Sequence, residues 1–175
     1  MSNIVLIGPM GSGKSTVGAA LARRLGRPHV DSDHFFVARY GPIPDYFTTH
    51  GEKDFREREH RVVAELLDSP RPSVISLGGG AVMDERTRAL LGEQMVIMLD
   101  ITEEQAALRI GDGTTRPVLG DEPMEAWKRI YAEREGIYRA CADMVLPADD
   151  ESIETRVDTI VARLNPTPSG DDTTP

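Results

Sequence analysis

Two patterns of apolar residues alternate along the chain. Short continuous runs, typical of buried strands, occur at residues 3–7, 29–31, 73–77, 95–100 and 144–146. Apolar residues spaced three or four apart, typical of amphipathic helices, occur at residues 15–25, 34–40, 45–50, 52–67, 84–91, 102–110, 124–138 and 153–164. Strands separated by helices of this length predict right-handed crossovers. We therefore expect a three-layer α/β fold, with a five-stranded parallel sheet flanked by helices.

One domain accounts for residues 1–164, because 175 residues leave too little chain for two independent cores. No repeat or low-complexity tract divides this part. Residues 111–123 are rich in Gly, Thr, Asp and Pro, and we expect them to form a mobile lid. Residues 165–175 contain three prolines, two aspartates and three threonines, so we expect a disordered tail.

Composition and charge exclude several classes of protein. The formal net charge is −9, which argues against a main role in coating nucleic acid or an anionic membrane. No apolar run reaches the ~20 residues of a membrane span, and the N-terminus lacks the basic region of a signal peptide. The single cysteine, Cys141, permits no internal disulfide. We expect a cytoplasmic monomer that acts on a small molecule.

Residues 8–15 read G-P-M-G-S-G-K-S and match the phosphate-loop pattern G-x-x-x-x-G-K-[ST]. The motif follows an expected strand and precedes an expected helix, as its chemistry requires. The glycines let backbone N–H groups turn toward phosphates at the positive end of the helix. Lys14 would reach the β and γ phosphates, and the Ser15 hydroxyl would ligate Mg²⁺. The motif predicts a nucleoside triphosphate site with magnesium.

Asp31 and Asp33 stand at the carboxyl end of the second expected strand. Residues two apart in an extended segment point the same way, roughly 6.5–7 Å apart. Both carboxylates can then face the phosphates, one near the metal and one near an acceptor hydroxyl. In the alternative interpretation, Asp33 only caps the helix that begins at His34, and Asp31 lies in solvent.

Other residues carry weaker signals. Arg56 and Glu59 share one helix face, and taken alone they read as a solvated pair. Arg134 is equally ordinary on its helix. The glycines at 78–80 follow a strand, which indicates either close approach of a ligand or a tight turn. Arg116 is the single cation of the expected lid. It either stabilises charge on the transferred phosphoryl group when the lid closes, or it is an ordinary loop charge.

Taken together, residues 8–16, 31–33, 51–56, 76–82 and 115–117 strongly resemble the motifs of shikimate kinases, in the same order along residues 1–164. The resemblance implies a kinase of the nucleoside-monophosphate-kinase-like class with a closing lid. It implies ATP and Mg²⁺ as cofactors, and phosphorylation of the 3-hydroxyl of shikimate to shikimate 3-phosphate in aromatic amino acid (chorismate) biosynthesis.

The same resemblance implies roles for individual residues. Asp33 would bind the acceptor hydroxyl and help to deprotonate it, and Asp31 would lie near the metal with Ser15. The substrate-binding residues would be Asp33, Arg56, Gly79, Gly80 and Arg134, with both arginines on the substrate carboxylate. The nucleotide-binding residues would be Gly11, Ser12, Gly13, Lys14, Ser15, Thr16, Arg109 and Arg116, with Arg109 packed on adenine. The catalytic residues would be Lys14, Asp33 and Arg116.

The chain also departs from the family pattern, at residues 35–38, at Pro42 and Pro44, and in the acidic loop at 149–151. The departure at Pro42 and Pro44 leaves the shape of the substrate pocket open. A nucleoside-monophosphate kinase is disfavoured because its acceptor phosphate needs more lid arginines. A kinase for another hydroxy-acid such as gluconate satisfies the same charge pattern. A non-catalytic nucleotide-binding relative would have lost Lys14, Asp33 or Arg116, and all three are present.

Overall fold

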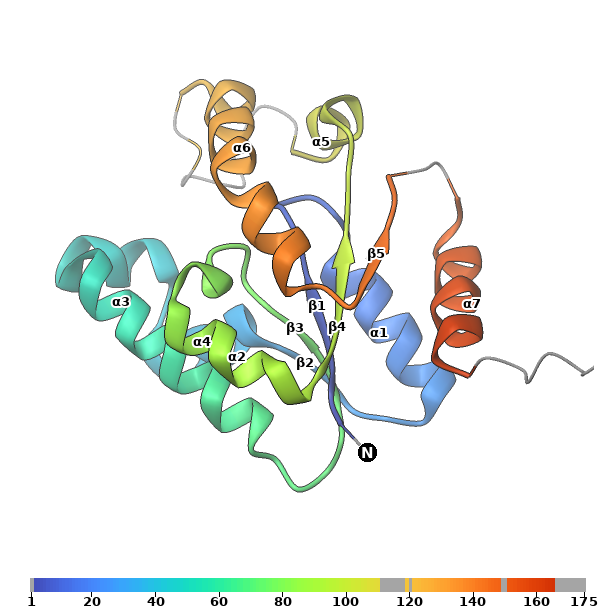
Figure 1. Ribbon diagram of the computed structural model, residues 1–175. Coiled ribbons are helices and arrows are strands. Elements are labelled where there is room, and N and C mark those ends of the chain that lie inside the picture. Colours follow the sequence, from blue (N-terminus) through green and yellow to red (C-terminus); the bar gives the residue numbers. More distant parts are fainter. Residues whose placement is uncertain (1, 111–118, 120, 149–150, 166–175) are drawn as a thin grey trace, which may run out of the picture.

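A five-stranded parallel sheet lies at the centre of the computed structural model, which describes residues 2–110, 119, 121–148 and 151–165. Its strands are β1 (Ile4–Ile7), β2 (His29–Asp31), β3 (Val74–Ser76), β4 (Met95–Leu99) and β5 (Met144–Leu146). They are ordered β2-β3-β1-β4-β5, and every neighbouring pair is parallel (Figure 1). The predicted α/β class and five-stranded parallel sheet are confirmed.

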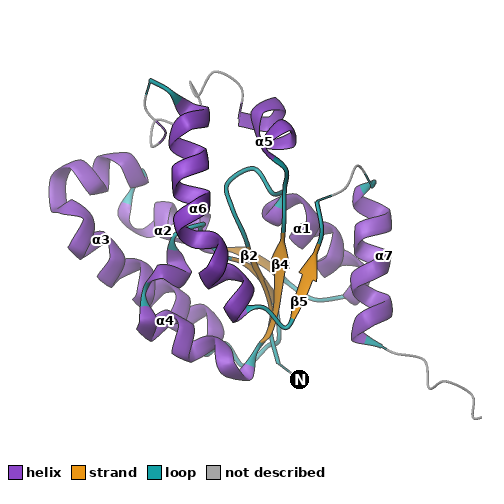
Figure 2. Ribbon diagram, turned by 45° about the horizontal axis from the view of Figure 1, so that its top comes forward, coloured by secondary structure: helices purple, strands orange, loops and turns teal. Residues whose placement is uncertain are grey.

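Helices cover both faces of this sheet (Figures 1 and 2). The described helices are α1 (Lys14–Leu25), α2 (Ser32–Tyr40), α3 (Ile43–Leu67), α4 (Glu85–Leu90), α5 (Glu103–Ile110), α6 (Pro123–Cys141) and α7 (Ile153–Leu164). Two short 3₁₀ turns, η1 (Ala81–Met83) and η2 (Leu91–Glu93), flank α4. None of these helices combines the length and apolar character that a membrane-spanning helix requires.

The central strand divides its side chains between two cores. Ile4 and Leu6 point toward α1 and α7, where they join a cluster that includes Leu21 and Ile160. Val5 and Ile7 point the other way, into a larger cluster formed with α2, α3, η1 and α6. All four residues of β1 are buried, as expected for a strand covered on both faces. The three layers therefore follow from alternation along one short strand.

The start of α2 decides between the two interpretations of the aspartate pair. The helix begins at Ser32, and its N-cap is Asp31, whose Oδ1 accepts hydrogen bonds from the N–H groups of Asp33 (3.0 Å) and His34 (3.2 Å). The interpretation in which Asp33 caps a helix beginning at His34 is therefore wrong. Asp31 performs the capping, which leaves the Asp33 side chain available for another role.

Helix α3 contains the break that its sequence predicts. Gly51 has φ 82° and ψ 169°, a conformation that interrupts the helix between the segments predicted at 45–50 and 52–67. The first segment begins two residues earlier than expected, at Ile43 after Pro42. Thr102 caps α5, because its hydroxyl accepts from the Gln105 N–H at 3.2 Å and Gln105 Oε1 accepts from the Thr102 N–H at 3.1 Å.

Most of the predicted lid at 111–123 falls outside the described residues, as do Arg116 and the tail from residue 166 onward. Leu119 is described and buried. It lies in a small third core with Ile101, Ile110 and Trp127, beyond the carboxyl ends of the strands. Helix α6 then begins at Pro123, so the described end of the predicted loop is packed against α5 and α6.

Candidate active site

The carboxyl ends of the strands open into a cavity of about 610 Å³. Its wall combines the phosphate loop after β1, Asp31 at the end of β2, Asp33 in α2, the glycines after β3, and side chains from α3 and α6. Ligands of open parallel sheets bind at this edge, outside the carboxyl ends of the strands. The fold thus gathers residues from distant parts of the chain around one space.

The phosphate loop has the backbone shape that its glycines permit. Gly11 and Gly13 have φ values of 86° and 87°, in the left-handed region that other residues rarely adopt. Gly13 is the N-cap of α1, and the first turn of that helix carries no acidic residue. The Lys14 ammonium donates to the carbonyls of Gly8 (2.9 Å) and Pro9 (3.0 Å). The loop therefore presents a helix N-terminus and a cation to the cavity.

The other loop residues predicted at the nucleotide take different positions. Thr16 lines the cavity. The Ser12 side chain is fully buried, and its N–H donates to the Pro9 carbonyl at 3.2 Å, so Ser12 shapes the loop itself. Arg109 reaches from the end of α5 and donates from Nη1 to the Gly11 carbonyl at 2.8 Å. Arg116 lies outside the described residues.

Ser15 and Asp31 face each other beside the phosphate loop. The Ser15 hydroxyl donates to Oδ2 of Asp31, while Oδ1 of the same carboxylate caps α2. A hydroxyl and a carboxylate are hard oxygen donors, the type that Mg²⁺ prefers. Magnesium in kinase sites takes one or two protein oxygens and completes its shell with phosphates and water. The donors present on this side of the loop therefore fit Mg²⁺.

Each glycine of residues 78–80 (the glycine loop) lies against a different polar side chain. A Cβ on Gly78 would collide with the Asp33 carboxylate, and a Cβ on Gly80 would lie 2.5 Å from Nη1 of Arg56. At Gly79 the nearest guanidinium atom is Nη1 of Arg134, 3.8 Å from where a Cβ would stand. Glycine is therefore needed at positions 78 and 80 for the close approach of Asp33 and Arg56, whereas a Cβ on Gly79 would make only ordinary contacts. Close approach of a ligand to this loop stays a prediction.

The environment of Asp33 changes its acidity. Burial is the main cause that raises the pKa of this carboxyl above its usual value, and the neighbouring Asp31 charge acts in the same direction. Lys14 and Arg56 partly oppose the rise. A carboxylate with a raised pKa is a stronger base toward a hydroxyl proton than an exposed aspartate would be.

Arg56 is held by a buried acid. Its Nη1 donates to Oε2 of Glu59 at 2.6 Å, and Glu59 is only 6% exposed. Burial raises the pKa of Glu59, while the charge and hydrogen bond of Arg56 oppose the rise. The interpretation of this pair as a solvated surface contact is therefore wrong. Glu59 fixes the direction of the guanidinium that leans on Gly80.

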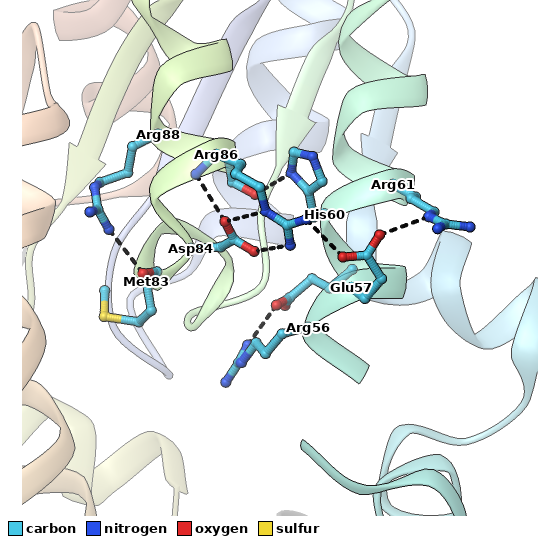
Figure 3. A network of polar contacts seen from close by, with 10 residues as sticks. Arg56, Glu57, His60, Arg61, Met83, Asp84, Arg86 and Arg88 are labelled. Atoms are coloured by element: carbon cyan, nitrogen blue, oxygen red, sulfur yellow. Dashed lines mark hydrogen bonds and ion pairs between the residues drawn. The ribbon is translucent and has the colours of Figure 1, made fainter. Parts of the chain in front are cut away.

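An ion-pair network joins α3 to the segment that follows the glycine loop (Figure 3). Arg86 bridges Glu57 on α3 (2.8 Å) and Asp84 at the start of α4 (2.7 Å), and it lowers the pKa of Asp84 to about 2. His60, one turn beyond Arg56, hydrogen-bonds the buried Thr87 hydroxyl at 3.0 Å. These contacts hold the turn of α3 that carries Arg56 close to α4 and so to the glycine loop.

Helix α6 lines the cavity with one face. Residues spaced four, three and four apart lie on the same side of a helix, and here they are Trp127, Tyr131, Arg134 and Tyr138. The Trp127 indole N–H donates to the Met10 carbonyl in the phosphate loop at 2.9 Å. Sequence reasoning selected Arg134 and missed the aromatic residues around it, although their helical spacing with Arg134 was a usable signal.

Comparison with known proteins gives one consistent family. A family model described as shikimate kinase matches residues 10–165. A shikimate kinase from Saccharopolyspora erythraea is 43% identical over 162 residues, which cover 91% of this chain and 92% of that relative. The structure of a shikimate kinase from Acinetobacter baumannii in complex with shikimate matches with a TM-score of 0.88 at 33% identity, covering 94% of this chain and 93% of that one.

A gluconokinase from Sinorhizobium meliloti has a TM-score of 0.60 at 20% identity, with 93% of each chain covered. At that identity the likeness extends to the fold alone. The family model, by contrast, spans most of the chain, and the Saccharopolyspora erythraea relative exceeds 40% identity over nine-tenths of both chains. The resemblance found in the sequence motifs is confirmed, and this α/β phosphate-loop kinase belongs to the shikimate kinase family.

Proposed function

We propose that the chain transfers the γ-phosphoryl group of ATP to the 3-hydroxyl of shikimate, which gives shikimate 3-phosphate and ADP in aromatic amino acid biosynthesis. The observation that carries the proposal is the glycine loop, whose consecutive residues lie against Asp33, Arg134 and Arg56. Consecutive Cα atoms lie about 3.8 Å apart, so a base and two guanidinium groups stand within the span of a small ring. A cyclic hydroxy-acid whose hydroxyl and carboxylate are on ring carbons 3 and 1 suits this spacing.

The phosphate loop and Lys14 would bind the triphosphate. The ammonium now hydrogen-bonds two loop carbonyls, and phosphate oxygens placed on the loop would offer it charged acceptors instead. Ser15 and Asp31 would hold Mg²⁺, which when bound neutralises charge on the β and γ phosphates. We further propose that Arg109 packs on adenine and that Arg116 stabilises the transferred phosphoryl group.

Asp33 would act on the acceptor hydroxyl. The carboxylate accepts a hydrogen bond from the hydroxyl, which aims the oxygen at the γ-phosphorus. As the new oxygen–phosphorus bond forms and the bond to the ADP oxygen breaks, the hydroxyl proton passes to Asp33. The raised pKa of this carboxyl supports the role, because a stronger base takes the proton more readily.

Arg56 and Arg134 would bind the substrate carboxylate. Guanidinium groups form charge-assisted, often bidentate hydrogen bonds with carboxylates. The buried Glu59 supports this role, because it fixes the Arg56 side chain before substrate arrives. The N–H groups of Gly79 and Gly80 would complete the pocket for the same substrate.

The test is an ADP-release assay with shikimate, gluconate and nucleoside monophosphates as separate acceptors. We expect turnover with shikimate and little with the other two classes. Preference for gluconate would assign a different hydroxy-acid, and absence of turnover with every acceptor would favour a non-catalytic nucleotide-binding protein. We also propose that the protein is a cytoplasmic monomer. Light scattering after size-exclusion chromatography measures its oligomeric state directly.

A further inference from the structure

Tyr138 has a polar contact at the cavity wall that the reaction described above does not use. The residue is 1% exposed, and its ring lies in the larger core with residues of β1, α2 and α3. Its hydroxyl reaches out of this core and donates to the Gly79 carbonyl at 2.5 Å. A buried apolar ring thus ends in one hydrogen bond to the middle of the glycine loop.

The same hydroxyl also interacts with Arg134, one helical turn earlier on α6. Burial raises the pKa of Tyr138, while the charge and hydrogen bond of the Arg134 guanidinium oppose the rise. The phenol therefore keeps its proton at neutral pH. The Tyr138 hydroxyl and Nη1 of Arg134 both lie against Gly79, 3.6 Å and 3.8 Å from where a Cβ would stand. Since a guanidinium has no acceptor, the phenol donates its single proton to the Gly79 carbonyl. Arg134, Tyr138 and Gly79 therefore form one cluster at the cavity wall.

The orientation of the glycine loop depends on that last hydrogen bond. A trans peptide is planar, so the Gly80 N–H points opposite to the Gly79 carbonyl. The first residue of the loop is held separately, because the Gly78 N–H donates to the buried Ser32 hydroxyl at 2.9 Å. The peptide between Gly79 and Gly80 has no bulky side chain to fix it. The Tyr138 hydroxyl supplies that constraint from the α6 side.

We propose that Tyr138 is a positioning residue for the acceptor carboxylate, acting through Arg134 and through the Gly79–Gly80 peptide. The inference rests on the proposed function, since it assigns a role in binding shikimate. A purely structural role would involve only the ring, which fills the core. The hydroxyl instead donates to Gly79 and lies against the same residue as Arg134 does, and Gly79 and Arg134 are both proposed to bind the substrate.

The direct test is Tyr138→Phe, which removes the hydroxyl and keeps the ring. We expect the KM for shikimate to rise about tenfold, the KM for ATP to change less than twofold, and kcat to change less than threefold. Tyr46→Phe is the matched control. Tyr46 is buried in the same core and donates its hydroxyl to Asp54, but it does not line the cavity. Tyr46→Phe should lower thermal stability and leave the KM for shikimate unchanged.

The pH dependence of the KM for shikimate adds a measurement that a purely structural role would not change. Site-specific 3,5-difluorotyrosine at position 138 keeps the hydroxyl and nearly the same shape but lowers the phenol pKa. The modified enzyme should bind shikimate normally at low pH and lose affinity as the phenol deprotonates, because a phenolate donates no hydrogen bond to Gly79. If Tyr138→Phe folds poorly, the fluorinated enzyme tests the positioning role in its place.

The outcomes separate this inference from the proposed function. An active wild type together with a normal KM for shikimate in Tyr138→Phe overturns the positioning role and leaves the proposed function standing. Equal KM changes in Tyr138→Phe and Tyr46→Phe, or a pH-independent KM in the fluorinated enzyme, also overturn it. A wild type that binds ATP but does not phosphorylate shikimate overturns the proposed function, and the positioning role for shikimate fails with it.

Discussion

Replacing Gly80 by alanine should move one side chain and little else. Gly80 has φ −97° and ψ −6°, a conformation that alanine also adopts, so the backbone accepts the change. The new Cβ would lie 2.5 Å and 2.6 Å from the two terminal nitrogens of Arg56 and 2.9 Å from its Cζ. Ordinary contacts of this kind are about 3.5 Å, so the guanidinium must retreat by about 1 Å.

This displacement sets the size of the expected effect. Arg56 hydrogen-bonds Glu59 at 2.6 Å, and a shift of about 1 Å away from Gly80 removes the guanidinium from the place where a carboxylate would meet it. Losing one charge-assisted hydrogen bond costs about 1.5–3 kcal/mol. At about 1.4 kcal/mol for each factor of ten, the KM for shikimate should rise roughly 10- to 100-fold.

The assay is steady-state kinetics with shikimate varied at saturating ATP, then ATP varied at saturating shikimate. Gly92→Ala is the control, because a Cβ at Gly92 meets nothing within 4 Å. We expect a raised KM for shikimate in Gly80→Ala alone, with the KM for ATP and the thermal unfolding temperature close to wild type. An unchanged KM for shikimate in a folded Gly80→Ala enzyme would refute the assignment of Arg56 to the acceptor carboxylate.

Four further substitutions test other parts of the site and fold. Asp33→Asn should lower kcat about 100-fold or more and yet raise thermal stability at pH 7. Burial raises the pKa of Asp33, so the charged carboxylate lowers the stability of the wild type above that pKa, and the stability gained by the variant should vanish near pH 3. Arg56→Lys should raise the KM for shikimate about tenfold, and a neutral amide analogue that responds equally would contradict the carboxylate contact. Gly136→Ala should stabilise α6 by about 0.5–1 kcal/mol, because its Cβ meets nothing within 4 Å. Gly18→Ala should destabilise α1, because its Cβ would lie 2.6 Å from the Ser76 hydroxyl. Calorimetry that finds Gly18→Ala more stable than Gly136→Ala would contradict this packing.

The sequence predicted those parts of the fold that depend on local patterns. Runs of β-branched and aliphatic residues located all five strands, and the glycine pattern located the phosphate loop that lines the cavity. Helix starts were less certain, because Asp31, Ser32 and Asp33 are all good N-cap residues and the pattern alone gave no ranking. In the structure, the hydrogen bonds from the Asp33 and His34 N–H groups identify Asp31 as the capping residue, and Asp33 lies against the glycine loop.

Burial was the main quantity that the sequence did not provide. Arg56 and Glu59 read as surface residues at helical spacing, and Glu59 is buried because α3 packs against the glycine loop, far away in sequence. Tyr138 was missed for a related reason. A tyrosine four residues after an arginine is common on helices, and its importance depends on a contact with the Gly79 carbonyl, 59 positions earlier.

Trp127 gives the protein an internal optical reporter. It is the chain's single tryptophan, and its indole N–H is bonded to the Met10 carbonyl inside the phosphate loop. Indole emission responds to hydrogen bonding and to nearby charge, so its intensity and wavelength will follow the state of that loop. Titration with ATP or ADP should therefore be readable by intrinsic fluorescence with no attached dye. Nucleotide affinity becomes measurable apart from turnover, including in variants that have lost all catalysis.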